Sequence, residues 1–246
     1  MNFFSLFKRK IFYKFKNKIN IDKDAVVEKN LDKLFFIYGS DKSNKFKAKQ
    51  KIIKGHGFSK FYTKYLKKFR FKKINILEIG SYSGASAAAF KKYFANSNVT
   101  CLDINISNFK YSSKDIKVFG TDIKKRENVI KLISNGRKKK YYYDLIVDDG
   151  SHNLSDILFA FNYLFRFLNK GGFYVIEDFK FPNYYNYNND IDDIFVDKMI
   201  KNLKLRKFFL SKLISRKSQR YFHNNIQSVY MHKGKLKNSD ICFIKK

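Results

Sequence analysis

Two features of the sequence predict an α/β fold built on a Rossmann-like, doubly wound sheet that is mostly parallel. Apolar runs typical of strands alternate with helical patterns between residues 74 and 178. Strands joined by crossover helices form parallel sheets that are covered on both faces. The end of the chain differs, because apolar runs at 225–233 and 241–246 flank a turn at 234–240. These two runs predict an antiparallel hairpin at one edge of the sheet.

The individual elements follow from the same pattern. Strands are predicted at residues 74–80, 98–105, 116–122, 143–149 and 173–178. Helices are predicted at 84–95, 126–135 and 154–169, the last of them closed by Gly171 and Gly172. Residues 21–72 are expected to be helical with a loop. The chain is thus divided into a basic N-terminal segment (1–20), a helical extension on the substrate side (21–73) and a main domain (74–246).

The composition leaves two explanations open for the charge. The 246 residues include 52 Lys and Arg against 21 Asp and Glu, which gives a formal net charge of +31. A nucleic acid or an anionic membrane is one partner that such a charge suggests. A codon bias toward Lys, Asn, Ile, Phe and Tyr explains the charge equally well. No apolar run approaches the roughly 18 to 20 residues that cross a bilayer, so no integral membrane protein is expected.

The two cysteines indicate a reducing, cytoplasmic compartment. Cys101 and Cys242 lie in apolar, strand-like runs, without the spacing of a disulfide framework or of a zinc site. Neither residue is therefore expected to form a disulfide or to bind zinc.

The N-terminal segment predicts an amphipathic helix. Residues 1–20 hold six basic side chains and no acidic one. In a helix, the apolar residues would lie on or near one stripe: Phe3, Phe4, Phe7, Ile11, Phe12 and Phe15. A helix of this kind suits the surface of an anionic membrane, at the inner face of the cell membrane in this case. The alternative is a helix that packs on its own domain.

The ends of the first three predicted strands suit a nucleotide-like cofactor, because ligands bind open parallel sheets beyond the carboxyl ends of the strands. The glycines of "LEIGSYSGAS" (77–86) let the backbone approach a ligand, and the helix that follows favours an anion. Asp103 ends the next strand, where a carboxylate can accept both hydroxyls of a ribose. Asp122 follows the third strand and can accept a hydrogen bond from an adenine amino group. The candidate cofactor-binding residues are Glu78, Gly80, Ser81, Gly84, Ser86, Asp103, Asp122 and Asp148.

Two later strands each end in a pair of acids, in "LIVDDGSH" (145–152) and "GGFYVIED" (171–178). Asp149 and Glu177 or Asp178 would converge at adjacent strand ends. Carboxylates that lie together repel one another unless one takes a proton or a cation lies among them. Oxygen ligands without a thiol favour Mg²⁺ or a similar ion over zinc. His152 can act there as a general base, or can simply cap the following helix.

These motifs, together with "VTCLDIN", "VFGTD" and "YDLIVDDGSH", resemble those of class I S-adenosylmethionine-dependent methyltransferases over residues 74–178. The pair "DDGSH" and "IED", preceded by "YGSDK" and "HGF", more narrowly resembles the metal-dependent sugar O-methyltransferases of the mycinamicin and macrocin type. The C-terminal "RYFHNNIQSVYMHKG" is similar to the closing region of that group. Two departures are Tyr82, which occupies the place of a glycine in the cofactor loop, and the basic start of the chain.

The resemblance implies a methyltransferase domain at 74–246, with S-adenosyl-L-methionine and Mg²⁺ or a similar divalent cation as cofactors. It implies Asp149, Glu177 and Asp178 as metal ligands, and His152 and Asp149 as the catalytic pair. Asp148 is left out of the metal site, since it can cap the turn instead. The implied reaction is methyl transfer to a hydroxyl of a sugar, glycan or secondary metabolite, by a cytoplasmic enzyme that forms homo-oligomers.

Two other functions remain open at this stage. The charge is compatible with an RNA ribose 2′-O-methyltransferase, whereas no DNA partner is expected. Methylation of base amino groups is disfavoured, because Pro182 is the only proline and a Pro-Pro-aromatic motif is therefore absent. The second alternative is a non-enzymatic, basic protein that binds membrane surfaces with the same fold.

Several polar segments have no settled role in the sequence. Residues 180–195, rich in Asn and Tyr, are either a substrate lid or a surface insertion. Asp41, Lys42 and His56 either border the substrate or are structural. His223 and His232 are assigned no role.

Overall fold

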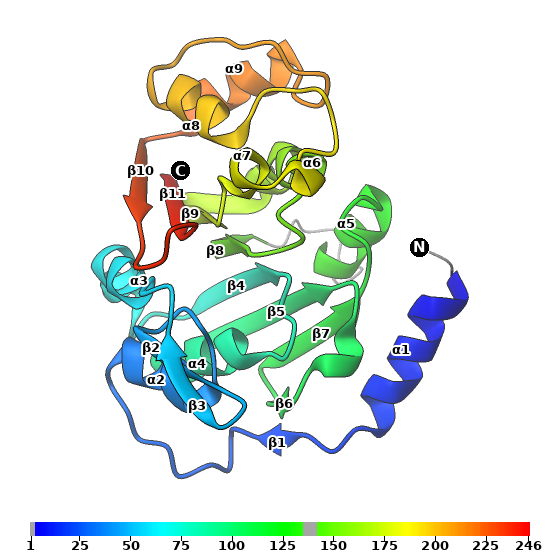
Figure 1. Cartoon of the computed structure of the whole chain (residues 1–246), viewed down its shortest axis with the longest axis vertical. Coiled ribbons are helices and arrows are strands. Elements are labelled where there is room, and N and C mark those ends of the chain that lie inside the picture. The colour runs from blue at the N-terminus through cyan, green and yellow to red at the C-terminus, as the bar shows by residue number, and fades with distance from the viewer. Residues whose placement is uncertain (1–2, 135–141) are drawn as a thin grey trace. The chain divides into compact units, whose positions relative to one another are not determined.

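The computed structural model describes residues 3–134 and 142–246. The chain forms two compact units, the first comprising Met1–Asp122 with Gly234–Lys237 and the second Ile123–Lys233 with Asn238–Lys246. Figure 1 shows the elements of both units. The division predicted at residues 20 and 73 remains a prediction.

The first unit contains three parallel strands, β4 (Ile74–Ile79), β5 (Ser97–Asp103) and β7 (Ile116–Gly120), in the order β4-β5-β7. Helix α4 (Ala85–Tyr93) connects β4 to β5. Five of the six residues of β4 are buried, which explains its nearly continuous apolar sequence. The three predicted strands and the first predicted helix are therefore confirmed, with ends that differ by a few residues.

The extension before β4 packs on α4 through aromatic side chains. Helices α2 (Leu31–Tyr38) and α3 (Ser59–Leu66) contribute Phe35 and Tyr62, and α4 contributes Phe90. The three rings meet edge to face, with centroids 5.3–6.1 Å apart. All three side chains are fully buried, so they form part of the core of the first unit. A short 3-10 turn, η1 (Lys67–Phe69), leads from α3 toward β4.

The loop predicted within residues 21–72 is in part a hairpin. Strands β2 (Lys45–Ala48) and β3 (Lys51–Lys54) pair antiparallel. The sequence prediction missed it because the turn carries none of the Gly or Asn residues that usually mark a hairpin. Instead, Lys49 adopts a left-handed backbone conformation with a φ of 56°.

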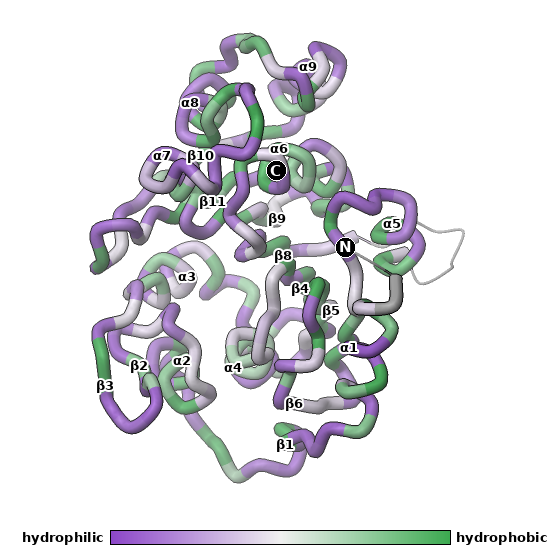
Figure 2. Tube along the Cα trace, turned by 45° about the vertical axis from the view of Figure 1, so that its right-hand side comes forward, coloured by the Kyte–Doolittle hydropathy of each residue, from purple (hydrophilic) through white to green (hydrophobic). Residues whose placement is uncertain are grey.

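Helix α1 (Phe3–Phe15) and Lys16 just after it pack on their own unit through Arg9, Tyr13 and Lys16. Arg9 donates to the carbonyl of Ile104 at 2.9 Å, and Lys16 donates to the carbonyl of Ser107 at 2.9 Å. Between them, Tyr13 meets Phe109 edge to face. Hydrophobic and hydrophilic residues alternate along α1 (Figure 2). Within the described ranges, no helix combines the length and apolar character needed to span a membrane.

The opposite face of α1 leaves apolar side chains in solvent. The exposed fractions are 53% for Phe7, 42% for Ile11, 56% for Phe12 and 77% for Phe15. The stripe predicted from the sequence is thus present, but it is not the face that packs on the protein. After α1, β1 (Ile19–Asn20) pairs in parallel with β6 (Tyr111–Ser112), and η2 (Ile106–Asn108) precedes β6.

The second unit contains four strands in the order β10-β11-β9-β8. Strand β8 (Tyr143–Asp148) pairs in parallel with β9 (Leu168–Glu177). Strand β11 (Asp240–Lys245) pairs antiparallel with both β9 and β10 (Ser228–Lys233). The predicted C-terminal hairpin and its place beside a strand of the sheet are confirmed, and so is the mostly parallel α/β fold class.

The helices of this unit follow in chain order as α5 (Arg126–Ser134), α6 (Leu154–Leu164), η3 (Phe165–Phe167), α7 (Phe181–Tyr184), η4 (Asn186–Asn188), α8 (Val196–Lys204) and α9 (Arg216–Asn225). The ring of Phe161 on α6 packs against Tyr174 of β9 and Phe222 of α9, with centroids 5.2 and 4.8 Å apart. These contacts fix α6 and α9 on the strands. The predicted end of α5, residue 135, lies outside the described residues.

One predicted boundary is wrong. The sequence suggests a helix over 154–169 closed by Gly171 and Gly172, but α6 ends at Leu164 and both glycines lie inside β9. Gly171 has a φ of 79°, and the β8–β9 register shifts at this point. A Cβ atom at Gly172 would lie 2.8 Å from the carbonyl oxygen of Asp144. The glycines therefore permit a bulge and a close backbone approach within a strand.

We expect Gly84→Ala to destabilise the first unit far more than Gly39→Ala. Both glycines have positive φ, 77° and 83°, but a Cβ at Gly84 would lie 2.5 Å from the Phe109 ring, whereas a Cβ at Gly39 would meet nothing within 4 Å. Backbone strain and overpacking together should cost about 2–5 kcal/mol at Gly84, against about 1 kcal/mol at Gly39. Urea unfolding measures both values, and equal losses would contradict the packing described.

Candidate functional site

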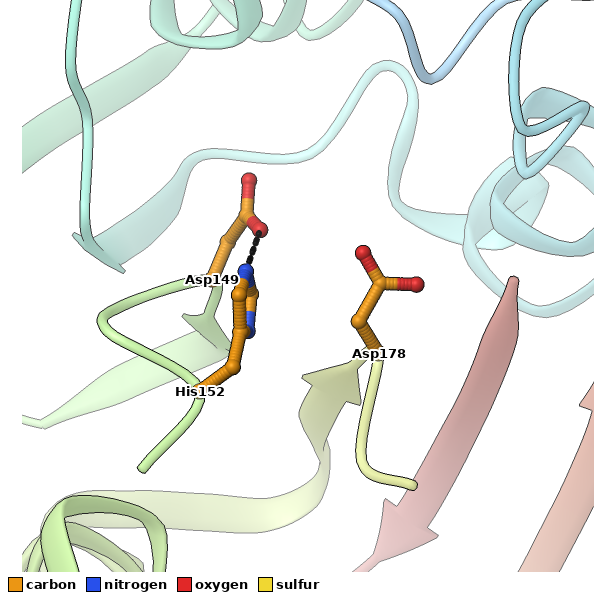
Figure 3. A group of neighbouring side chains, drawn as sticks. All are labelled: Asp149, His152 and Asp178. Carbon is orange, nitrogen blue, oxygen red and sulfur yellow. Dashed lines mark ion pairs between the residues drawn. The ribbon is translucent and has the colours of Figure 1, made fainter. Parts of the chain in front are cut away.

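Three predicted site residues lie together in the second unit. Asp149 directly follows β8, Asp178 directly follows β9, and His152 lies in the loop after β8 (Figure 3). The parallel register pairs Asp148 with Ile176, which brings the two strand tips side by side. As a result, one ligand atom from each of Asp149, His152 and Asp178 lies within 4.8 Å of the others.

Two members of this cluster have unusual backbone conformations. His152 has a φ of 57° and Asp178 a φ of 49°, in the left-handed region that non-glycine residues seldom adopt. Such conformations cost on the order of 1–3 kcal/mol each and persist only where the surroundings impose them. The Asp178 carbonyl accepts from the amide of Phe181 at 2.9 Å, and the His152 ring packs on the Phe181 ring at 4.7 Å. Phe181 thus supports both residues.

The donor set fits a divalent cation. Nε2 of His152 lies 3.7 Å from Oδ1 of Asp149, and Asp178 is almost fully buried. Two ionised carboxylates whose oxygens lie within 4.8 Å of each other repel by roughly 3 kcal/mol or more at an effective dielectric constant of 20. A cation among them reverses the sign of this interaction. Two carboxylates, with an imidazole nearby and no thiol, suit Mg²⁺ or Mn²⁺ better than a structural zinc.

Glu177 is not a member of the compact group. This residue ends β9, is 2% exposed, and pairs in register with Ile241 of β11. Its assignment as a third carboxylate ligand remains a prediction.

Asp148 is the buried partner of Tyr174. It is the last residue of β8, is 4% exposed, and accepts from the hydroxyl of Tyr174 at 3.3 Å. Burial, together with the charges of Asp149 and Asp156, raises the pKa of Asp148 to about 7. This geometry fits a residue that shapes the tip of β8, and its role as a cofactor-binding residue remains a prediction.

The predicted cofactor loop lies in the first unit and has a tightly turned backbone. Gly80, Tyr82 and Gly84 have φ values of 79°, 41° and 77°. Tyr82, which replaces an expected glycine, therefore takes up the backbone conformation that favours glycine. Its amide donates to Oδ2 of Asp103 at 2.7 Å, and its side chain is 67% exposed. The loop keeps its turned shape without the glycine, at the cost of some strain.

Polar contacts join the other predicted residues to this loop. Ser86 donates to Oε1 of Glu78 at 2.5 Å, and both side chains are buried. Ser81 donates to the carbonyl of Glu78 at 3.3 Å. The Thr121 amide donates to the Asp103 carbonyl at 2.9 Å, which ties the tip of β7, just before Asp122, to the tip of β5. Six predicted residues and the strand end before Asp122 thus gather at the carboxyl ends of three neighbouring strands.

The sequence analysis missed the residues that hold the loop of His152. Asn188 is buried and donates to the Ser151 carbonyl at 3.2 Å and to Oδ1 of Asn153 at 3.0 Å. Asp190 accepts from the amide and the hydroxyl of Ser155. Both come from the Asn/Tyr-rich segment 180–195, whose low complexity gives no signal for individual contacts.

The remaining histidines lie outside the cluster. Nε2 of His56 is 3.6 Å from Oδ2 of Asp41 in the first unit, so these two residues at least support each other. His223 packs on Phe208 within the second unit. A substrate role for Asp41, Lys42 or His56 remains a prediction.

Comparison with known proteins gives matches in sequence and in structure, although no protein-family model matches the chain. It is 32% identical over 155 residues to L-olivosyl-oleandolide 3-O-methyltransferase of Streptomyces antibioticus, covering 60% of this chain and 36% of that protein. It is 26% identical over 130 residues to demethylmacrocin O-methyltransferase of Streptomyces fradiae, covering 50% of this chain and 32% of that protein.

The solved structure of MycE methyltransferase from the mycinamycin biosynthetic pathway, in complex with Mg, SAH and mycinamycin VI, superimposes with a TM-score of 0.65 at 22% identity. The match covers 88% of this chain and 53% of that chain. The chain has the class I methyltransferase fold. The resemblance to sugar O-methyltransferases of the mycinamicin and macrocin type is confirmed as well. The chain spans 31% to 37% of the length of the curated relatives that it matches.

We expect the cluster to bind Mn²⁺ in the absence of any substrate, because its donors are preorganised. Asp178→Asn should weaken this binding at least tenfold, since the change removes a buried charged ligand but keeps the size of the side chain. Asp192→Asn is the matched control, because its side chain is 99% exposed and lies outside the cluster. Electron paramagnetic resonance of free Mn²⁺ measures both affinities. Equal Mn²⁺ affinities of the two variants would contradict a metal site that includes Asp178.

Proposed function

We propose that this chain is an S-adenosyl-L-methionine-dependent O-methyltransferase, assisted by Mg²⁺ or a similar divalent cation, that acts on a hydroxyl of a sugar or glycosylated acceptor. The observation that carries the proposal is the cluster of Asp149, His152 and Asp178 at two neighbouring strand ends. The names of the relatives support it, because those proteins methylate sugar hydroxyls of small molecules.

Asp149 and Asp178 would hold the cation, with Glu177 as a further candidate. A divalent cation supplies positive charge that lowers the pKa of a neighbouring hydroxyl, which by itself is about as weakly acidic as water. His152 takes the hydroxyl proton on Nε2, the ring nitrogen that faces Asp149. The Asp149 carboxylate then stabilises the charged imidazole. General-base help of this kind contributes about 10²- to 10⁴-fold to the rate.

The loop of the first unit would bind the cofactor, whose sulfonium supplies an activated methyl group. Asp103 already accepts hydrogen bonds from the backbone amides of Tyr82 and Asn105, which hold its carboxylate at the tip of β5. Asp103 would accept the ribose hydroxyls, and Asp122 the adenine amino group. Glu78 and Ser86 would keep the turn in the shape that the cofactor requires. The first unit's own contribution is therefore to hold these groups in place for the cofactor.

We expect His152→Ala to lower kcat for methyl transfer by about 10²- to 10⁴-fold while Mn²⁺ affinity falls less than threefold. This result would show that His152 acts as a base and not as a metal ligand, because loss of a ligand lowers the affinity for the cation first. EDTA should abolish the activity and added Mg²⁺ should restore it.

The same assay distinguishes the alternatives. Methyl transfer to RNA that persists in EDTA would favour a ribose 2′-O-methyltransferase. Cofactor binding without transfer to any sugar or RNA would favour a non-enzymatic protein. Assembly into homo-oligomers remains a prediction.

We further propose that α1 lies on an anionic membrane surface. Its exposed apolar side chains, Phe7, Ile11, Phe12 and Phe15, stand beside exposed Lys8, Lys10 and Lys14. Apolar residues that enter the headgroup region, flanked by lysines that meet anionic lipid, make up the surface-binding type of amphipathic helix. Packing through Arg9 and Tyr13 leaves this face open within the first unit. The enzyme would then act at the inner face of the membrane.

Vesicle sedimentation tests this contact. The chain should bind phosphatidylglycerol vesicles and not phosphatidylcholine vesicles, and 0.5 M salt should weaken the binding because it screens surface charge. Phe7→Ser combined with Phe12→Ser should reduce binding at least tenfold, since each exposed ring contributes buried apolar area in the membrane. Phe71→Ser is the control, because Phe71 is 80% exposed but lies outside α1. Equal losses in both variants would contradict the proposal.

A further inference from the structure

A row of aromatic rings begins at the candidate base. The ring of His152 packs on Phe181 with centroids 4.7 Å apart, Phe181 packs on Tyr185 at 5.2 Å, and Tyr185 stacks on Tyr187 at 5.5 Å and 29°. Phe181, Tyr185 and Tyr187 are here called the aromatic ladder. These ring contacts lie within the second unit, and through them the ladder connects the imidazole with the surface of that unit.

The segment that carries the ladder is fixed at its beginning by a buried carboxylate. Asp240 of β11 is 2% exposed and accepts from the hydroxyl of Tyr184 at 2.9 Å and from Lys233 at 2.8 Å. Lys180, just before α7, lies 3.4 Å from the other oxygen of Asp240. A buried charge with several partners is costly to displace, so α7 has little freedom to move away from β11.

The end of the segment is fixed to the loop of His152. Asn188 donates to Ser151 and Asn153, and Asp190 accepts from Ser155 and lies 3.8 Å from Lys124. The ladder is therefore held between two polar anchors, one on the C-terminal hairpin and one on the loop of the candidate base. These contacts argue for a fixed wall of the site rather than a freely moving insertion.

Exposure increases along the ladder away from the histidine. Phe181 and Tyr185 are half-buried, and Tyr187 is 75% exposed although Tyr185 covers one of its faces. The hydroxyl of Tyr185 accepts from the amide of Asn238 at 3.4 Å, which restrains that ring as well. An exposed ring that is ordered by stacking is suited to binding, because little side-chain freedom is lost when a ligand covers it.

We propose that the aromatic ladder is the platform for the sugar ring of the acceptor, with Tyr187 and Tyr185 as the residues that determine acceptor specificity. This inference rests on the proposed function and adds to it the class of ligand and the residues that meet it. One face of a pyranose ring presents C–H groups with a slight positive charge, and the face of an aromatic ring is negative. Stacking of the two selects a ring without requiring a particular hydroxyl. The ladder leads to His152, so an acceptor that covers Tyr187 with one ring would extend along the ladder and present the hydroxyl to be methylated to the imidazole with another part.

The chain contains no tryptophan, which allows a direct binding test. Tyr187→Trp keeps an aromatic face and introduces a single tryptophan at the end of the ladder, whose emission can be excited apart from that of the tyrosines. Titration with methyl α-L-rhamnopyranoside and methyl β-D-glucopyranoside should shift its emission with a saturable, millimolar dependence. Sorbitol carries similar hydroxyls but no ring face, and it should cause no such shift. Phe71→Trp is the control for an exposed tryptophan elsewhere, and its emission should not respond.

Kinetics give a second, independent measurement. Tyr187→Ala should raise KM for a neutral glycoside acceptor by about tenfold, the equivalent of about 1.4 kcal/mol, while kcat changes less than threefold. Tyr187→Phe should behave like the wild type, because the ring face is retained. Thermal unfolding within a few degrees of the wild type would show that Tyr187→Ala is folded.

The outcomes separate this inference from the proposed function. A saturable shift with glycosides in Tyr187→Trp supports the platform even if no methyl transfer is found. Methyl transfer with an unchanged KM in Tyr187→Ala overturns the platform and leaves the proposed function intact. An equal response to sorbitol, an equal response of Phe71→Trp, or no response to either glycoside also overturns it.

Discussion

Parallel pairing of β8 with β9 is the constraint on which the candidate site depends. The register that joins Asp148 to Ile176 places the residues after both strands side by side, and oxygens of Asp149 and Asp178 lie within 4.8 Å of each other. Their mutual repulsion, roughly 3 kcal/mol when both are ionised, opposes folding unless a positive charge lies between them. A divalent cation held by both carboxylates would relieve this repulsion and would supply the positive charge that the proposed chemistry needs.

The backbone around this point is strained in a consistent way. His152 and Asp178 both adopt left-handed conformations, and Phe181 contacts both of them. In the first unit, Tyr82 adopts the same conformation in the predicted cofactor loop. Strain at functional positions is retained where the surroundings over-determine it. The polar anchors of Asn188, Asp190 and Asp240 provide such surroundings in the second unit.

The sequence predicted the strands well because buried parallel strands have nearly continuous apolar runs and short connections. Asp149, His152 and Asp178 could be found because acids at neighbouring strand ends meet by topology alone. The boundary at Gly171 was missed because a glycine pair can close a helix or form a bulge, and only the neighbouring backbone of Asp144 decides between them. Asn188 and Asp190 were missed because they lie in a segment without periodicity, and their partners, Ser151 and Ser155, are more than 30 residues away in the sequence.

The most direct test is a crystal structure of the protein grown with Mn²⁺, with anomalous diffraction recorded at the manganese edge. The account predicts one strong anomalous peak within bonding distance of carboxylate oxygens from both Asp149 and Asp178. The same map shows whether Glu177 completes the ligand set and whether His152 remains outside it. Carboxylates that point away from each other with no peak between them would contradict the central claim.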